Sequence, residues 1–207
     1  MVLKRWAIAL LICCLSIGTA MASSETITPL NAIKERIDRI IDVLNDPRYH
    51  APDQKGRQRE KIWEISQPMF DFEEISRRTV GPKWKDFSEA EKTKFTDVFA
   101  AFLSNTYIDK IQGEYHNEQI VYLKELVKEP LALVRTKLVR TNSEIPIDYR
   151  MRKNDTDWKV YDILVENGVS LVQNYRVQFR SVLEKETPAE LIQRLEKKLK
   201  EQNKAAQ

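Results

Sequence analysis

Apolar residues recur every three or four positions over the first half of the chain, which is the period of an amphipathic helix. Thr28-Pro29 joins a hydroxyl cap to a proline at the first helical position, and residues 45–47 (Asn-Asp-Pro) end the helix that begins there. Residues 46–56 are polar and are expected to form a loop. A second helix is expected over residues 57–67.

Further helical signals follow this loop and helix. The segment from Phe72 to Trp84 predicts a short helix and a turn at Gly81-Pro82. Ser88 and Glu91 have the spacing of a capping box, which opens a long amphipathic helix. The apolar side of this helix carries Phe95, Val98, Phe99, Phe102, Leu103 and Tyr107.

From residue 118 the apolar period shortens to two, as expected for half-buried β-strands. The connections between the apolar runs are short, which favours an antiparallel meander. In the third run, Tyr149 and Met151 share one face, whereas Arg150 and Arg152 share the other. The four predicted strands are Ile120–Val127, Leu131–Thr141, Ile145–Lys153 and Trp158–Val165.

Helical spacing returns after Gly168, where the sheet is expected to end. A helix is expected from Val169 to about Glu184, and Thr187-Pro188 begins a last helix before a polar tail from about residue 201. Helices, then strands, then helices indicate an α+β fold. We therefore predict a four-stranded antiparallel curved sheet wrapped by helices.

Residues 1–22 are predicted to be a secretory signal peptide. Lys4 and Arg5 form the basic start, 12 apolar residues follow, and Ala20-Met21-Ala22 fits the small-x-small cleavage pattern. A bilayer span needs about 20 apolar residues, which disfavours the alternative of an uncleaved anchor. Both cysteines lie in the apolar run, so cleavage leaves one domain over residues 23–207 without cysteine. We expect this domain in the periplasm, stabilised without disulfides.

Charge and motif content exclude several functional classes. The chain has 34 basic and 31 acidic residues, a net charge of +3 that falls to +1 without Lys4 and Arg5. A nucleic-acid binder normally presents a strongly basic face, so no nucleic-acid partner is expected. The five glycines form neither a phosphate-binding loop nor a nucleophile elbow. His50 and His116 lack neighbours at metal-ligand spacing, so no metal, cofactor or catalytic residue is predicted.

Three carboxylates keep an enzyme open as an alternative. Curved sheets wrapped by helices house acid–base enzymes, and Asp148, Asp162 or Glu166 could act as the base in such a pocket. That role requires a buried carboxylate with a raised pKa. Asp162 could equally bond to a turn or to the start of a helix.

A basic cluster and a dense group of aromatic residues are the remaining candidates. Arg77, Arg78, Lys83 and Lys85 form either solvated surface or a contact for anionic lipid headgroups or an acidic partner. Eight aromatic residues crowd into residues 70–107, beside predicted strands that carry four more. An apolar helix face that meets an apolar sheet face can fill the space between them or leave a cavity.

Several ordered segments resemble the MlaC family, also called toluene-tolerance proteins. Phe70–Trp84 resembles the family's D-F-x-x-I-S-R-x-x-L-G-x-x-W signature, and Phe95–Tyr107 resembles its aromatic helix. Trp158–Ile163 and Val165–Leu171 are similar to its strand-to-helix junction, which Asn174–Phe179 continues. The similarity extends over nearly the whole chain after the leader.

The resemblance implies a periplasmic phospholipid carrier of the Mla pathway and no enzymatic activity. Such carriers move lipid between an inner-membrane ABC transporter with an MCE-domain protein and an outer-membrane lipoprotein–porin complex, which maintains outer-membrane lipid asymmetry. Their fold is related to the nuclear-transport-factor-2 cone. The acyl chains lie in an apolar cavity between sheet and helices, with the headgroup outside. We expect a monomer with this organisation.

The same resemblance suggests which residues meet the lipid. Arg77 and Arg78 are the expected contacts for the headgroup or for a partner protein. Val169 is expected to face the same interior as the strands and the long helix. A carrier of hopanoid or another isoprenoid lipid would share these features and stays open as an alternative. The residues expected to line the cavity are Phe72, Ile75, Trp84, Phe99, Phe102, Leu103, Tyr107, Tyr149, Met151, Val160, Ile163 and Val169.

Overall fold

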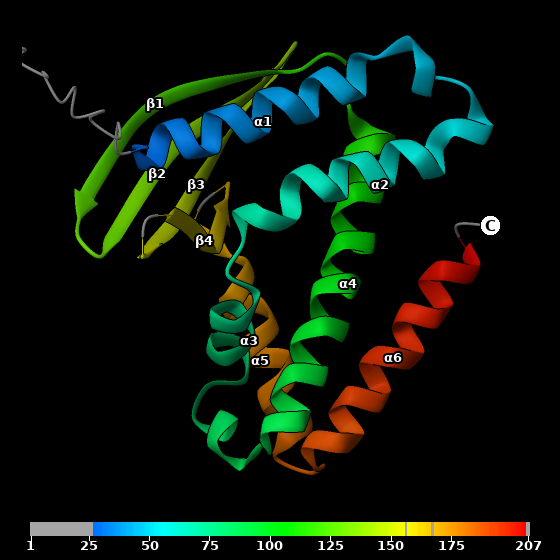
Figure 1. Cartoon of the computed structure of the whole chain (residues 1–207), viewed down its shortest axis with the longest axis vertical. Helices are drawn as coiled ribbons and strands as arrows, with labels where there is room; N and C mark the ends of the chain where they lie inside the picture. The colour runs from blue at the N-terminus through cyan, green and yellow to red at the C-terminus, as the bar shows by residue number, and fades with distance from the viewer. Residues whose placement is uncertain (1–26, 156, 167, 206–207) are drawn as a thin grey trace, which may run out of the picture.

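The computed structural model describes residues 27–155, 157–166 and 168–205. The predicted signal peptide, residues 1–22, lies outside the described residues. Figure 1 shows two regions, an antiparallel sheet crossed by one helix and a group of helices that extends away from the sheet. Within the described part of the chain, no helix is both long and apolar enough to cross a membrane.

The two N-terminal helices form where the sequence predicts them. α1 spans Pro29–Asn45, and the Thr28 hydroxyl caps it by accepting a hydrogen bond from the backbone N–H of Asn31 at 3.2 Å. α2 spans Lys55–Ser66. The segment between them, expected to be a loop, contains two 3-10 turns, η1 (Pro47–Tyr49) and η2 (Pro52–Gln54). Each turn begins with proline, whose fixed φ and missing N–H suit a first helical position.

The predicted short helix is α3, which spans Phe72–Val80. The Asp71 carboxylate caps it by accepting a hydrogen bond from the Glu74 backbone N–H at 3.0 Å. Gly81 follows with a φ of +70°, and a Cβ there would lie 3.2 Å from the Arg176 guanidinium. Conformation and space therefore both favour glycine at this turn. Two 3-10 turns flank α3, η3 (Gln67–Met69) and η4 (Gly81–Asp86).

The long helix is α4, which spans Glu89–Glu114 and begins with the predicted capping box at Ser88. The last two helices, α5 (Leu171–Leu183) and α6 (Pro188–Ala205), run beside it in Figure 1, and α6 packs along α4. The polar residues from 201, expected to form a tail, continue α6 to Ala205. We refer to α3, α4, α5 and α6 as the helical bundle.

The sheet has five antiparallel strands in the order β1-β2-β3-β4-β5, so the prediction of four strands is wrong. The extra strand is Val169–Ser170, which pairs with Leu164 and Val165, and α5 consequently starts at Leu171 rather than Val169. A two-residue strand is too short to show an alternating pattern. The other strands are β1 (Gln119–Lys128), β2 (Leu131–Arg140), β3 (Ser143–Asn154) and β4 (Asp157–Val165).

Candidate functional site

The residues predicted to line one lipid cavity divide between two hydrophobic clusters. The helical cluster contains Phe72, Ile75, Trp84, Phe99, Phe102 and Leu103. The sheet cluster contains Tyr149, Met151, Val160 and Ile163. Phe70 packs against both clusters. Tyr107 and Val169 are exposed.

The helical cluster is held together by aromatic rings from α4 and α5. Phe95 and Phe99 of α4 are fully buried. The Phe99 ring centroid lies 5.1 Å from those of Tyr175 and Phe179, and both pairs meet edge to face. Ring quadrupoles favour this geometry. Rings packed in this way fill the space between the helices, so this cluster is a folding core.

The sheet cluster lies between α1 and one face of the sheet. Strand register places Ala132, Met151 and Val160 in one row across this face, and all three are buried. The backbone N–H of Asp71 donates to the Val160 carbonyl at 2.9 Å, which brings the chain between η3 and α3 against this row. In the next row, burial raises the pKa of Tyr149 to about 12. This end of the face is therefore closed.

Toward the other end of the strands the same face is open. Ile147 pairs with Thr136 on one side and Val165 on the other, and Leu138 pairs with Ile145 one row further. These four apolar side chains are half-buried or exposed, although they continue the rows of the buried ones. We define the open end as Leu138, Ile145, Ile147, Ile163 and Val165. An apolar surface left uncovered is typical of a binding site.

Of the five residues of the open end, only Ile163 was predicted from the sequence to meet lipid. A signal for two of them exists, because the alternation that marks Tyr149 extends back to Ile147 and Ile145 on the same face. Their exposure depends instead on how far α1 and the chain near Met69 cover the sheet. No periodic pattern encodes that limit, so only the tertiary structure reveals the open end.

A charged row, formed by Glu114, Glu118 and Arg140, borders the open end. The Glu118 carboxylate accepts a hydrogen bond from the His116 backbone N–H at 2.6 Å and lies 3.2 Å from Arg140 Nε. Arg140 also reaches the Glu114 carboxylate of α4 at 3.6 Å. Burial raises the pKa of Glu118, but backbone hydrogen bonds and the charge of Arg140 outweigh it, so its pKa lies below the ordinary value. Two carboxylates therefore hold Arg140 at the end of β2.

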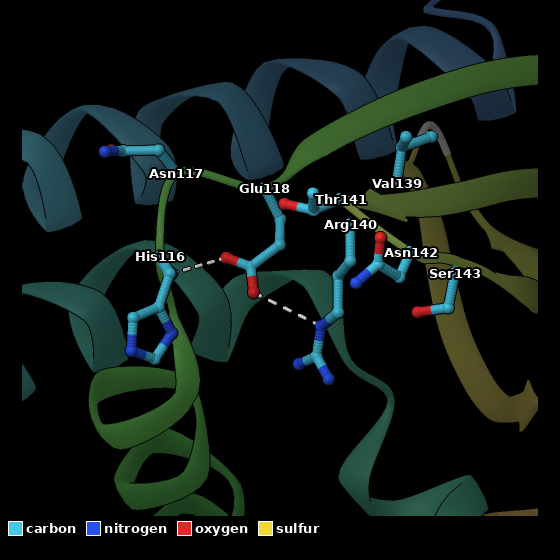
Figure 2. Close-up of a pocket in the computed structure, with 8 residues that line it drawn as sticks. All are labelled: His116, Asn117, Glu118, Val139, Arg140, Thr141, Asn142 and Ser143. Atoms are coloured by element: carbon cyan, nitrogen blue, oxygen red, sulfur yellow. Dashed lines mark hydrogen bonds and ion pairs between the residues drawn. The ribbon is translucent and has the colours of Figure 1, made fainter.

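A polar pocket of about 350 Å³ opens beside this row. The turn after α4 and the hairpin between β2 and β3 form its walls, and Figure 2 shows the Glu118 and Arg140 side chains directed toward one another. Arg140 lies two residues after Leu138 along β2, so the pocket adjoins the open end. Its lining residues are His116, Asn117, Glu118, Val139, Arg140, Thr141, Asn142 and Ser143.

The two predicted headgroup residues are ion-paired within the protein. Arg77 and Arg78 each place Nε 2.7 Å from the buried Glu74 carboxylate, and Arg152 of β3 approaches it at 3.3 Å. The Arg78 guanidinium also lies 4.2 Å from the Tyr161 ring centroid. Burial raises the pKa of Glu74, but hydrogen bonds from both arginines outweigh it, so its pKa lies below the ordinary value. The cluster ties α3 to the sheet.

This arginine cluster and the polar pocket lie at opposite ends of β3. Arg152 is close to the last residue of the strand, whereas Ser143 is the first and lines the pocket. They are nine positions apart along the strand, which corresponds to about 30 Å at 3.3 Å per residue. Arg77 and Arg78 are therefore remote from the polar pocket.

Val169 and Tyr107 were predicted to line the cavity, and both are exposed. Val169 is 62% exposed on the short edge strand β5. Because it pairs with Val165, its side chain shares the sheet face of the open end and lies at its rim. Tyr107 lies at the surface of α4, where partial burial raises its pKa.

The buried Asp162 carboxylate has a helix-capping position. It accepts hydrogen bonds from the Val172 backbone N–H at 3.0 Å and from the Ser170 hydroxyl at 2.8 Å. The Arg150 guanidinium donates a third at 3.2 Å. A carboxylate bound to N–H groups at a helix start stabilises that helix. The observed contacts of Asp162 thus fit the anchoring of α5 to the sheet.

Comparisons with known proteins agree with this architecture. Residues 34–197 match the family model described as MlaC protein, whereas no curated protein matches the chain. A similar solved structure is that of the phospholipid-binding protein from Ralstonia solanacearum, determined in complex with a phospholipid. The TM-score is 0.71 at 22% identity, and the alignment covers 83% of this chain and 97% of that chain. The likeness confirms the predicted α+β class with an antiparallel sheet.

Proposed function

The chain belongs to the MlaC family, and from that premise we propose that it is a periplasmic phospholipid carrier. One observation carries the proposal: the sheet face beneath α1 is buried at one end and remains apolar and open at the other. The fold is also that of a protein that binds a phospholipid. An acyl chain on the open end would complete the burial that the protein leaves unfinished.

The free energy of exposing lipid explains why such a carrier is needed. Each methylene taken from water contributes about 0.8 kcal/mol, so two chains of about 16 carbons cost on the order of 20 kcal/mol to expose. Shielding this surface requires an apolar face and a stable scaffold. The open end and the helical bundle fit these two requirements.

The headgroup belongs at the charged row in this proposal. Acyl chains would lie over Ile145 and Ile147, and the phosphate would reach Arg140 at the polar pocket. Arginine binds phosphate through paired N–H donors. Glu114 is the looser of the two carboxylates on Arg140, at 3.6 Å, and is the one that a phosphate would displace.

The transport partners are proposed from the resemblance to the MlaC family. We propose that the protein takes part in lipid exchange between an inner-membrane MCE-domain ABC transporter and an outer-membrane lipoprotein–porin complex. A hopanoid or other isoprenoid cargo would occupy the same apolar surface. Mass spectrometry of lipid extracted from the purified protein separates these cargoes, because a phospholipid carries phosphorus and an unmodified hopanoid does not.

The test of the proposed site is a charge placed on the open end. Ile147→Glu puts a carboxylate among the acyl chains, where an unpaired charge is strongly disfavoured. We expect this variant to remain folded but to lose its co-purified phospholipid. Val177→Glu is the matched control, because Val177 is 61% exposed on α5, away from the sheet. Full lipid occupancy in Ile147→Glu, or a wild-type protein that takes up no lipid from vesicles, would rule out this site.

A second pair of variants assigns the headgroup contact. Arg140→Gln removes the charge beside the pocket, and Arg77→Gln removes one at the arginine cluster. We expect the first to lower the retention of anionic phospholipid relative to zwitterionic phospholipid. The same change in headgroup composition with Arg77→Gln, and not with Arg140→Gln, would return the contact to the α3 arginines.

A further inference from the structure

The hairpin between β1 and β2 carries large apolar side chains in solvent at its tip. Leu126 is 50% exposed, Val127 49% and Leu131 45%. Figure 1 shows this hairpin extending past the start of α1, at the far side of the molecule from α6. These residues are at the closed end of the sheet, so they are separate from the open end proposed to hold lipid.

The exposed residues occupy both faces of the hairpin. Val127 pairs with Ala132, whose side chain is buried beneath α1, and therefore lies on the α1 side. Leu126 pairs with Leu133, one position along the strand, so it points to the opposite face. Leu131 pairs with Lys128 on that same outer face. A tip that is apolar on two faces suits immersion in an apolar medium better than docking on one flat protein surface.

Lysines surround these apolar residues. Lys124 and Lys128 alternate with Leu126 on the outer face, and Lys159 joins the row of Leu131 through Arg152. None of these three lysines forms an ion pair with another of the described residues, and the Lys159 ammonium donates a hydrogen bond to the Pro68 carbonyl at 3.1 Å. We define the tip surface as Lys124, Leu126, Val127, Lys128, Leu131 and Lys159.

The two acidic residues of the hairpin itself, Glu125 and Glu129, are already engaged. Glu129 at the turn is paired with Lys153 at 2.7 Å, and Glu125 accepts a hydrogen bond from the Leu30 backbone N–H at 2.7 Å. The lysines of the tip surface therefore present positive charge beside apolar side chains. This combination complements the interface of an anionic bilayer, where acyl chains adjoin negative phosphates.

Pairing of the β1 edge with another strand fits the observations less well. The register of β1 shifts between Tyr122 and Lys124, and a bulge disrupts the ladder that a partner strand would extend. Lysines on an edge strand also oppose such pairing. A second copy of the chain would bring Lys124 and Lys128 close to their equivalents.

We propose that the tip surface docks this protein on anionic phospholipid bilayers by inserting Leu126, Val127 and Leu131 at the headgroup–acyl boundary. The lysines bind the phosphates around the inserted side chains. Docking at this end of the strands leaves the open end accessible. The proposal rests on the tip alone and would hold even without lipid carriage.

Co-sedimentation with vesicles tests the proposal. The wild-type protein is expected to bind vesicles of phosphatidylethanolamine and phosphatidylglycerol, to bind phosphatidylcholine vesicles more weakly, and to dissociate as salt is raised. Leu126→Ser with Leu131→Ser is expected to lower the affinity about tenfold, because two half-exposed leucines no longer enter the bilayer. The matched control is Val177→Ser, which removes an equally exposed apolar side chain elsewhere.

A second variant tests the contribution of the lysines of the tip surface. Lys124→Gln with Lys128→Gln is expected to lower the affinity for the anionic vesicles about tenfold or more, at roughly 1 kcal/mol for each lysine. The control is Lys197→Gln with Lys198→Gln on α6. Circular dichroism and thermal unfolding establish that every variant is folded, and the single change Leu126→Gln replaces the double variant if that one unfolds.

The vesicle-binding experiment and the lipid-retention experiment give results that can be told apart. Tip variants are expected to retain their co-purified lipid, whereas Ile147→Glu is expected to bind vesicles normally. A wild-type protein that does not sediment with anionic vesicles at low salt would overturn the proposal, as would unchanged binding by the tip variants. A wild-type dimer that Leu126→Ser with Leu131→Ser dissociates, with vesicle binding unaffected, would assign the surface to a second copy instead.

Discussion

The helical bundle and the open end of the sheet use the same types of apolar residue but leave them in different environments. Phe95 and Phe99 are enclosed by rings from a neighbouring helix. Ile147 and Val165 share a sheet face with buried residues yet remain partly in solvent. Side chains of the bundle thus enclose its central rings, whereas the apolar side chains of the open end are covered on the sheet side only in part.

This difference indicates a division of labour. The bundle supplies one core whose packing needs no ligand, and the closed end of the sheet supplies a second. The sheet can then leave apolar area unfilled, because the folding free energy does not depend on covering it. The arginine cluster around Glu74 joins the two regions by linking α3 to Arg152 of β3.

The largest loss of unfolding free energy is expected from Phe99→Ala, in the helical bundle. Removing a fully buried ring leaves a cavity in a close-packed core, which costs about 3–5 kcal/mol. We expect urea unfolding to show a loss in this range, with or without bound lipid. A loss below about 1 kcal/mol would mean that the bundle can collapse around the cavity and is not the rigid region.

Glu74→Gln is expected to have the next largest effect. It removes the charge that holds Arg77, Arg78 and Arg152, and because the arginines face solvent the cost is about 1–3 kcal/mol, below that of a fully buried pair.

The effect of this substitution depends on pH. The pKa of Glu74 is lowered from 4.5 in the folded protein, so its stabilisation is complete above pH 4.5 and is lost as the pH falls through the lowered value. Unfolding of wild type and Glu74→Gln measured over this range should therefore converge in acid. A constant difference at every pH would show that the carboxylate charge is not responsible.

Ile147→Ala is expected to affect stability little and lipid more. Because the side chain is only half-buried, the cost to unfolding of the lipid-free protein is about 1 kcal/mol or less. Phospholipid retention should fall, because apolar contact area is lost at the open end. If the lipid-free variant instead lost about 3 kcal/mol or more of unfolding free energy, as expected for Phe99→Ala, the open end would be packed core.

Val169→Glu is expected to have the smallest effect on stability. Its side chain lies largely in solvent at the edge strand, so the free energy of unfolding should change by about 0.5 kcal/mol or less. Because Val169 pairs with Val165 at the rim of the open end, lipid retention should fall, but less than in Ile147→Glu. Thermal unfolding and lipid extraction of this one variant check both expectations. Unchanged lipid occupancy would show that the binding surface ends before β5.

Much of the local structure could be predicted because its signals are local. Thr28 and Ser88 cap helices where expected, and the alternation in β3 places Tyr149 and Met151 on the buried face. Each of these features depends on side chains within a few residues of one another. The expected start of a helix at Val169 was wrong, because the residue pairs with Val165 in a strand too short to leave a periodic signal.

The sequence alone determined the helices and long strands, their order, the resemblance to the MlaC family and the apolar types of the residues involved. Periodicity and capping act over a few residues, so they can be read without knowing the fold. Only the tertiary structure decided that the apolar residues divide into two clusters and that Ile147 and Leu138 remain open. Exposure depends on which distant segment covers a side chain, and the reach of α1 across the sheet is set by packing between segments far apart in the chain.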